Sequence, residues 1–158
     1  MYHVILLVPL ACIATLHADD LPSSIALEAE IKKSMNERGV QPFTLRLVAK
    51  DKEVVVLTDG FSPKVSQEGK VWTILFTPTD RKDDKGRTIV QPPTRYGLVK
   101  LQPNEVALMH VPYSPTIREA IKEAADGNGE IRVIYEVTQT WAKRLGATPC
   151  KVSSMAAK

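Results

Sequence analysis

The chain has 158 residues and a formal net charge of +3, with 21 lysine and arginine residues scattered among 18 aspartate and glutamate residues. Because no basic run is interleaved with aromatic residues, the composition argues against a nucleic-acid-binding surface, and we expect no nucleic-acid partner. The length predicts one folded domain.

The first 18 residues have the composition of a secretory signal peptide. An apolar run from Val4 to Leu16 is followed by the small residue Ala18 and then by Asp19-Asp20. The run is shorter than the about 20 apolar residues that a membrane-spanning helix needs. We therefore predict a signal peptide over 1–18 and a single domain over 19–158. The expected location is exported, either periplasmic or extracellular, with no stable membrane insertion after signal cleavage. An uncleaved anchor is the alternative.

Most of the chain after residue 24 alternates apolar and polar residues, which is the pattern of a half-buried strand. Ile25 to Lys33 alternates in this way, although its Glu, Ala and Lys content favours a helix by propensity. We predict a strand there, and a first helix is the alternative. The other predicted strands cover 43–49, 53–58, 71–77, 96–101, 106–111, 129–137 and 148–152. The last six residues are expected to be frayed.

Two polar segments interrupt this pattern. Residues 59–69 hold Gly60, Pro63 and Gly69 and predict a loop. Residues 79–94 contain Asp83-Asp84-Lys85-Gly86, which has turn chemistry and is compatible with a ribbon that runs out and returns. Either segment is a candidate contact loop.

One segment has a helical period instead. Ser114 and Pro115 can serve as N-cap and first helical residue, or Thr116 and Glu119 can form a capping box. Glycines stop the pattern at Gly127 and Gly129. We therefore expect one helix at about 115–126, whose apolar stripe is Ile117, Ala120, Ile121 and Ala124.

The strongest strand pattern is Gly129 to Val137, in which Ile131, Val133, Tyr135 and Val137 share one face. Seven or eight such strands with short turns predict a mainly β sandwich or barrel. The order of the segments, with Leu101-Gln102-Pro103-Asn104-Glu105 before the last strands, resembles the immunoglobulin-like sandwich domains common in exported bacterial proteins. That family typically has leucine-x-proline-glycine-glutamate at this turn, so Asn104 replaces a glycine. The resemblance implies an immunoglobulin-like antiparallel β-sandwich with one inserted helix.

No residues form a recognisable catalytic or metal-binding pattern. Beyond the signal, His110 is the only histidine and Cys150 the only cysteine, which is too few for a usual zinc site. The aspartates Asp80, Asp83 and Asp84 lack the spacing of a calcium loop. We expect no enzyme activity, no catalytic residue, no metal and no cofactor, and we expect Cys150 to be a small core residue.

Trp141 is the candidate binding residue. It lies in Thr138 to Arg144, a stretch that looks like a loop, next to two cations. We expect an exported, non-catalytic binding or interaction module with a protein partner. One alternative is an inhibitor of a proteinase or another hydrolase that uses 59–69 or 79–94. A second alternative is a small hydrolase with an unrecognised carboxylate pair.

Overall fold

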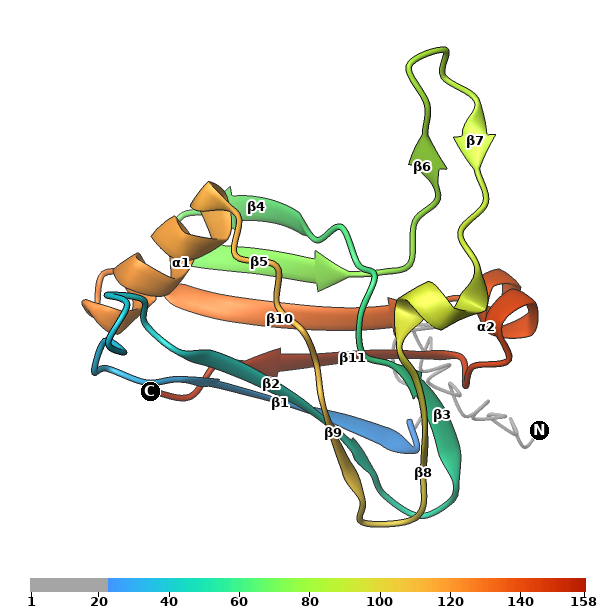
Figure 1. Ribbon diagram of the computed structural model, residues 1–158. Helices are drawn as coiled ribbons and strands as arrows, with labels where there is room; N and C mark the ends of the chain where they lie inside the picture. The colour runs from blue at the N-terminus through green and yellow to red at the C-terminus, as the bar shows by residue number, and fades with distance from the viewer. Residues whose placement is uncertain (1–22) are drawn as a thin grey trace, which may run out of the picture.

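The computed structural model describes residues 23–158, which form a mainly β structure with several sheets (Figure 1). The predicted signal peptide over 1–18 lies outside the described residues. The strands are β1 (Ile25–Ile31), β2 (Phe43–Ala49), β3 (Val54–Leu57), β4 (Lys64–Glu68), β5 (Val71–Phe76), β6 (Arg81–Lys82), β7 (Thr88–Ile89), β8 (Leu98–Leu101), β9 (Val106–Leu108), β10 (Glu130–Val137) and β11 (Cys150–Met155). The helical elements are η1 (Pro93–Tyr96), α1 (Pro115–Ala125) and α2 (Gln139–Leu145).

The first sheet has the strand order β1-β2-β9 and is antiparallel. Its register places Ile25 opposite Ala49 and Ile31 opposite Phe43. Every second residue of β1 and β2 is buried, which is the period-two pattern that the sequence contains. Ile25–Ile31 is therefore a strand, as predicted, and the helical alternative is wrong. Burial of one apolar face outweighs the helical propensity of its Glu and Ala residues.

The second large sheet has the order β11-β10-β5-β4. Here β10 pairs with β5 in parallel, with Ile131 opposite Trp72, whereas its other neighbour, β11, is antiparallel to it. The prediction of a wholly antiparallel sandwich is therefore wrong for this pair. The long connection from β5 to β10, which includes α1, brings the chain back to run in the same direction, as a parallel pair requires.

The C-terminal segment joins the two large sheets. The amide of Ile31 donates to the carbonyl oxygen of Ala157 at 2.8 Å, and the amide of Ala157 donates to Ala29 at 2.9 Å. On the other side, the amide of Ala156 donates to the carbonyl of Ile131 at 2.8 Å. The expectation of a frayed C-terminus is wrong. These hydrogen bonds hold Ala156 against β10 and Ala157 against β1, so the residues after β11 are ordered.

The buried side chains of both sheets and both helices form one apolar cluster, an arrangement compatible with a β-sandwich. Phe76 and Tyr135 lie fully buried within it, and Phe61 packs edge-on against their rings, with centroid distances of 5.8 Å to Phe76 and 5.9 Å to Tyr135. Phe61 belongs to the segment predicted as a loop over 59–69. That prediction is wrong in part, because the segment buries this ring and then forms β4.

The predicted helix is confirmed as α1. The Ser114 hydroxyl accepts a hydrogen bond from the Ile117 amide at 3.3 Å, and Pro115 begins the helix. Its apolar stripe packs toward the core, and Glu123 accepts a bond of 2.7 Å from the Trp72 indole on β5. No helix among the described residues is long and apolar enough to cross a membrane.

The prediction of one inserted helix is wrong, because Gln139–Leu145 forms a second helix, α2. The Thr138 hydroxyl accepts a hydrogen bond from the Trp141 amide at 3.4 Å and caps the start, while Gly146 ends the helix at φ 71°. The segment buries Ala142 and Leu145. Seven residues contain too few turns to show a helical period, so the sequence pattern resembles a loop.

Candidate interaction surface

A hairpin of two short strands projects from the body of the molecule; we call residues 79–92 the arm (Figure 1). Strand β6 pairs with β7 through Arg81 opposite Ile89 and Lys82 opposite Thr88. The sequence is compatible with a ribbon in this segment, and the structure confirms it. The arm protrudes past the neighbouring elements, so a partner can reach both of its faces.

The tip of the arm is ordered by Asp83. Its Oδ1 accepts hydrogen bonds from the amides of Lys85 and Arg87 at 2.9 and 2.8 Å, and its Oδ2 accepts one from the Arg87 Nε at 2.6 Å. These bonds, the amide of Arg87 first, lower the pKa of Asp83 below its ordinary value. Asp83 therefore keeps a folded turn at the tip, and Asp80, Asp83 and Asp84 do not gather as metal ligands.

The base of the arm is held by an ion pair to α2. Arg144 donates two hydrogen bonds to Asp80, of 2.9 and 2.8 Å, one to each carboxylate oxygen. This fork-to-fork geometry is the strongest form of a carboxylate–guanidinium pair. Its hydrogen bonds lower the pKa of Asp80 and raise that of Arg144. The arm therefore leaves the body at a fixed point.

Trp141, the candidate binding residue, lies within this base. The Arg144 guanidinium carbon is 4.5 Å from the centroid of the Trp141 ring, and the Tyr96 ring packs edge-on at 5.9 Å. The Tyr96 hydroxyl donates to the carbonyl of Thr79 at 3.2 Å. Trp141 is partly buried and packs beside the residues that support the arm, with part of its surface left in solvent.

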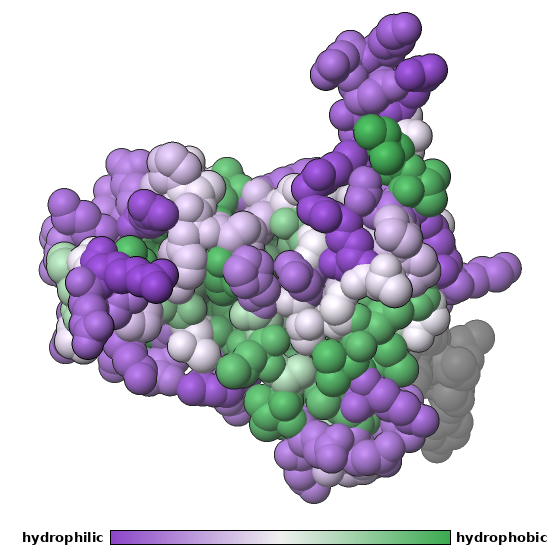
Figure 2. All heavy atoms as spheres, in the orientation of Figure 1, coloured by the Kyte–Doolittle hydropathy of each residue, from purple (hydrophilic) through white to green (hydrophobic). Residues whose placement is uncertain are grey.

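The arm carries exposed apolar side chains near its base. Ile89 is 45% exposed and Val90 is 67% exposed. Figure 2 shows this apolar stretch on the stem of the arm, below a hydrophilic tip. Exposed apolar groups next to one another on an otherwise polar projection are typical of a contact site.

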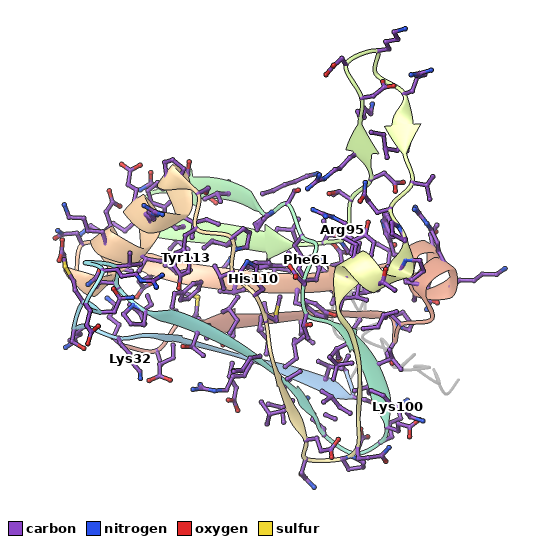
Figure 3. The ribbon with its side chains drawn as sticks, in the orientation of Figure 1. Lys32, Phe61, Arg95, Lys100, His110 and Tyr113 are labelled. Carbon is purple, nitrogen blue, oxygen red and sulfur yellow. The ribbon has the colours of Figure 1, made fainter. Side chains whose placement is uncertain are left out.

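A second apolar patch covers strands β8 and β9 on the same face of the molecule (Figure 2). Its members are Leu98, Val106 and Leu108, which are 38%, 50% and 65% exposed. Lys100, also on β8, pairs with Glu53 at 2.9 Å and marks its polar border (Figure 3). We call Leu98, Val106 and Leu108 the edge patch.

Strand β9 is an edge strand, and its hydrogen-bond pattern gives the direction of its peptide groups. The Ala49 amide donates to Glu105, and the Met109 amide donates to Leu45, so the odd-numbered residues of this segment face β2. In an antiparallel pair the intervening residues point the other way. The peptide groups of Val106 and Leu108 therefore point away from β2, and these are the residues whose side chains are exposed.

Strand β4, an edge strand of the second large sheet, differs from β9. Strand β4 reads Lys-Val-Ser-Gln-Glu, and four of its five side chains are exposed polar groups. Charged and polar side chains on an edge strand discourage pairing with another chain. The edge at β9 lacks this protection, so the two edges differ in their capacity to accept a strand.

The other residues considered from the sequence form no site. His110 is exposed just after β9, and its amide donates to the carbonyl of Thr58 at 2.8 Å (Figure 3). Cys150 is partly buried, and burial raises its pKa to about 12. Within residues 23–158, no three metal-ligating side chains gather and no buried side-chain nitrogen or oxygen lacks a hydrogen-bond partner.

The edge patch was not predicted from the sequence. Alternating apolar residues in 106–111 indicate a strand, but they do not show that β9 ends a sheet or which of its faces meets the core. Comparisons with protein-family models, with curated proteins and with solved structures found no match.

Proposed function

We propose that the protein is a non-catalytic interaction module that binds a protein partner through the arm and the edge patch. The observation that carries the proposal is the position of the exposed apolar side chains. Seven large apolar side chains are exposed in the described residues. Ile89 and Val90 lie on the arm, Leu98, Val106 and Leu108 form the edge patch, and only Met35 and Met155 lie elsewhere.

The anchored arm suits this role energetically. Binding costs less when a loop is already ordered in its bound form. The Asp80–Arg144 pair and the Asp83 turn fix both ends of the arm before a partner arrives. Contact with the apolar stem can then contribute to affinity with little loss of backbone freedom.

The edge patch suits an extended segment of the partner. The outward peptide groups of Val106 and Leu108 can pair with another backbone, while their side chains supply apolar contact. Strand addition of this kind takes its affinity from main-chain hydrogen bonds and its specificity from alternate side chains.

We test the proposal by a cross-linked pull-down with the tagged chain from Asp19 onward, using the native exported fraction. The variants Val90→Glu and Leu108→Glu place a charge on each apolar site, and Ser66→Glu places the same charge on the exposed edge of β4. One stoichiometric partner that is retained by Ser66→Glu and lost by the other two supports the proposal. A partner retained by all three variants contradicts it.

A second candidate, an inhibitor of a proteinase or another hydrolase, is favoured by the projection of the arm. A protruding, internally bonded loop can enter an enzyme cleft. The test is a panel of exported hydrolases assayed with excess protein. Inhibition that disappears in a variant with the tip 83–87 replaced by Gly-Asn supports this function, and a panel without inhibition removes it.

We also propose that the protein is exported and that its framework is of the immunoglobulin-like type. The apolar run in the first 18 residues supports export, and intact mass of the cell-derived protein tests it through a predicted N-terminus at Asp19. The turn at Gln102 to Glu105 supports the framework, because Asn104 has a φ of 69°, a conformation that glycine adopts most readily. An experimental structure that showed a closed barrel instead would contradict the framework.

A further inference from the structure

A hollow lies between the loop that links β1 to β2 and the first turns of α1, away from the arm. Its volume is about 240 Å³, which is just below the range of about 300–1,000 Å³ usual for ligand pockets. It is therefore of a size for a small ligand. Tyr113, one of its lining residues, lies on this side of the molecule (Figure 3).

The charged residues around the hollow are all cations. Arg38 comes from the loop, and Arg118 and Lys122 come from α1. None of the ion pairs between described residues involves any of the three. Arg118 and Lys122 lie four residues apart on α1 and so share one face of the helix.

The carboxylate of Glu123, which follows Lys122 on α1, is directed elsewhere. Glu123 accepts hydrogen bonds from the Trp72 indole and from the Gln67 amide, which lie on β5 and β4. No aspartate or glutamate lines the hollow. The site is therefore electrostatically open to an anion.

The walls of the hollow between these cations are apolar. Met35, Val40, Ile121 and the Tyr113 ring line it, and Ile121 belongs to the buried core. Inorganic anions gain little from such walls, whereas a hydrocarbon body placed against them is removed from water. The hollow thus combines three cations with an apolar surface.

The backbone of the loop and the Tyr113 side chain are held in place before any ligand binds. In the loop, the Asn36 side-chain oxygen accepts hydrogen bonds from the amides of Arg38 and Val40, each at 3.0 Å. The Tyr113 hydroxyl accepts from the Phe43 amide and donates to the Phe43 carbonyl, each at 3.2 Å. Such order lowers the cost of binding.

We infer that this hollow binds a small organic carboxylate with an apolar body. The guanidinium groups of Arg38 and Arg118 match the two oxygens of a carboxylate, and Lys122 adds a third positive charge. The hydrocarbon part of the ligand packs on Tyr113 and Ile121. The inference is independent of the protein-binding proposal, because it rests on a different part of the surface.

The test is a titration of the purified protein followed by amide chemical shifts in nuclear magnetic resonance spectra. The probes are 3-phenylpropanoate, its neutral amide 3-phenylpropanamide, acetate, and a capped peptide with one glutamate. The inference predicts saturable shifts at Gly39, Tyr113 and Arg118 with 3-phenylpropanoate, and much weaker binding of the neutral amide and of acetate.

Variants then assign the charges. Arg118→Gln and Arg38→Gln should each weaken binding of 3-phenylpropanoate about tenfold, since each removes hydrogen bonds to a charged group. Lys143→Gln on α2 removes one charge far from the hollow in sequence and serves as the control. Spectra that are unchanged away from the substituted residue show that each variant is folded.

Several outcomes overturn the inference. Equal affinity for the carboxylate and the neutral amide shows an apolar hollow without anion selection. Unchanged affinity in Arg38→Gln and Arg118→Gln shows that these cations do not bind the ligand. Saturable binding of the glutamate peptide alone shows a docking site for an acidic protein segment, and the absence of saturable shifts with every probe shows that the hollow binds none of these anions.

Discussion

The buried hydroxyl of Tyr135 shows how a single side chain supports the core. It accepts a hydrogen bond of 2.9 Å from the Leu57 amide and so connects β10 to β3. Desolvation by burial raises the pKa of this hydroxyl well above its ordinary value. The phenol therefore stays neutral across the physiological pH range.

Substitution Tyr135→Phe should lower the free energy of unfolding by about 1–3 kcal/mol, because the Leu57 amide would be left buried without its partner. Urea unfolding followed by fluorescence measures the change. Tyr113→Phe is the control for loss of a less buried hydroxyl, and we expect a smaller effect. Equal losses in the two variants would contradict this role for burial.

Cys150 should be unreactive in the folded protein at neutral pH. Burial raises its pKa to about 12, and the thiolate is the reactive form. We expect iodoacetamide to label Cys150 slowly in native protein and quickly in urea, as measured by peptide mass spectrometry. Equally fast labelling in both conditions would show that the thiol is accessible and ionised.

The Asp80–Arg144 pair gives the arm a pH dependence. The ordinary pKa of an aspartate is near 3.8, and the hydrogen bonds from Arg144 lower that of Asp80 in the folded protein. The contribution of the pair is therefore complete above the ordinary pKa, and it is lost as the pH falls through the lowered one. Because both side chains are partly exposed, we expect the pair to contribute little to the free energy of global unfolding and to act mainly on the order of the arm.

Asp80→Asn should accordingly increase amide hydrogen exchange in β6 and β7 at neutral pH while the exchange of β10 stays unchanged. In the parent protein, the same loss of protection, measured relative to the intrinsic exchange rate at each pH, should appear only at pH values below about 4. Exchange measured by nuclear magnetic resonance separates the two regions. An arm that exchanges equally in parent and variant at neutral pH would show that the ion pair does not order it.

At the scale of elements, the connection between β3 and β4 depends on close contact with η1. Gly60 has a φ of 76°, and a Cβ added there would lie 2.7 Å from the carbonyl oxygen of Arg95. The backbone atom cannot move aside as a flexible side chain could. Gly60 therefore allows the chain to pass η1 and to insert Phe61 into the core.

Gly60→Ala should destabilise the protein by more than the about 1–2 kcal/mol that a left-handed conformation alone costs. Gly127→Ala isolates that conformational cost, because Gly127 has a φ of 80° and open space around it. Thermal or urea unfolding of the two variants gives the comparison. If Gly60→Ala and Gly127→Ala lower the free energy of unfolding equally, the approach of the added Cβ to Arg95 does not destabilise the protein.

For the whole molecule, local sequence patterns predict some features better than others. Period-two burial correctly indicates β1, β2 and β10, because alternate residues of those strands face one core. It does not show that β5 and β10 run in parallel, since direction depends on how the intervening chain returns. Nor does it show that Ala156 and Ala157 join the sheets, because small residues have no strong apolar pattern.

Local sequence patterns likewise predict only part of the candidate interaction surface. Turn residues at Asp83 to Gly86 predict a ribbon, and Trp141 is recognisable as an aromatic residue beside cations. The anchoring of the arm joins residues that are 64 positions apart, Asp80 and Arg144, and no local signal reports such a contact. The edge patch likewise depends on sheet order, which places Leu108 at an open edge.

The most direct test of the protein-binding account is site-specific photo-cross-linking in the native exported fraction. A photoreactive amino acid is placed at Val90, at Leu108, and at two controls, Ser66 on β4 and Glu119 on α1. The account predicts that Val90 and Leu108 capture the same protein and that the controls do not. Capture from the control positions alone, or of unrelated proteins from the two test positions, would contradict an interaction surface made of the arm and the edge patch.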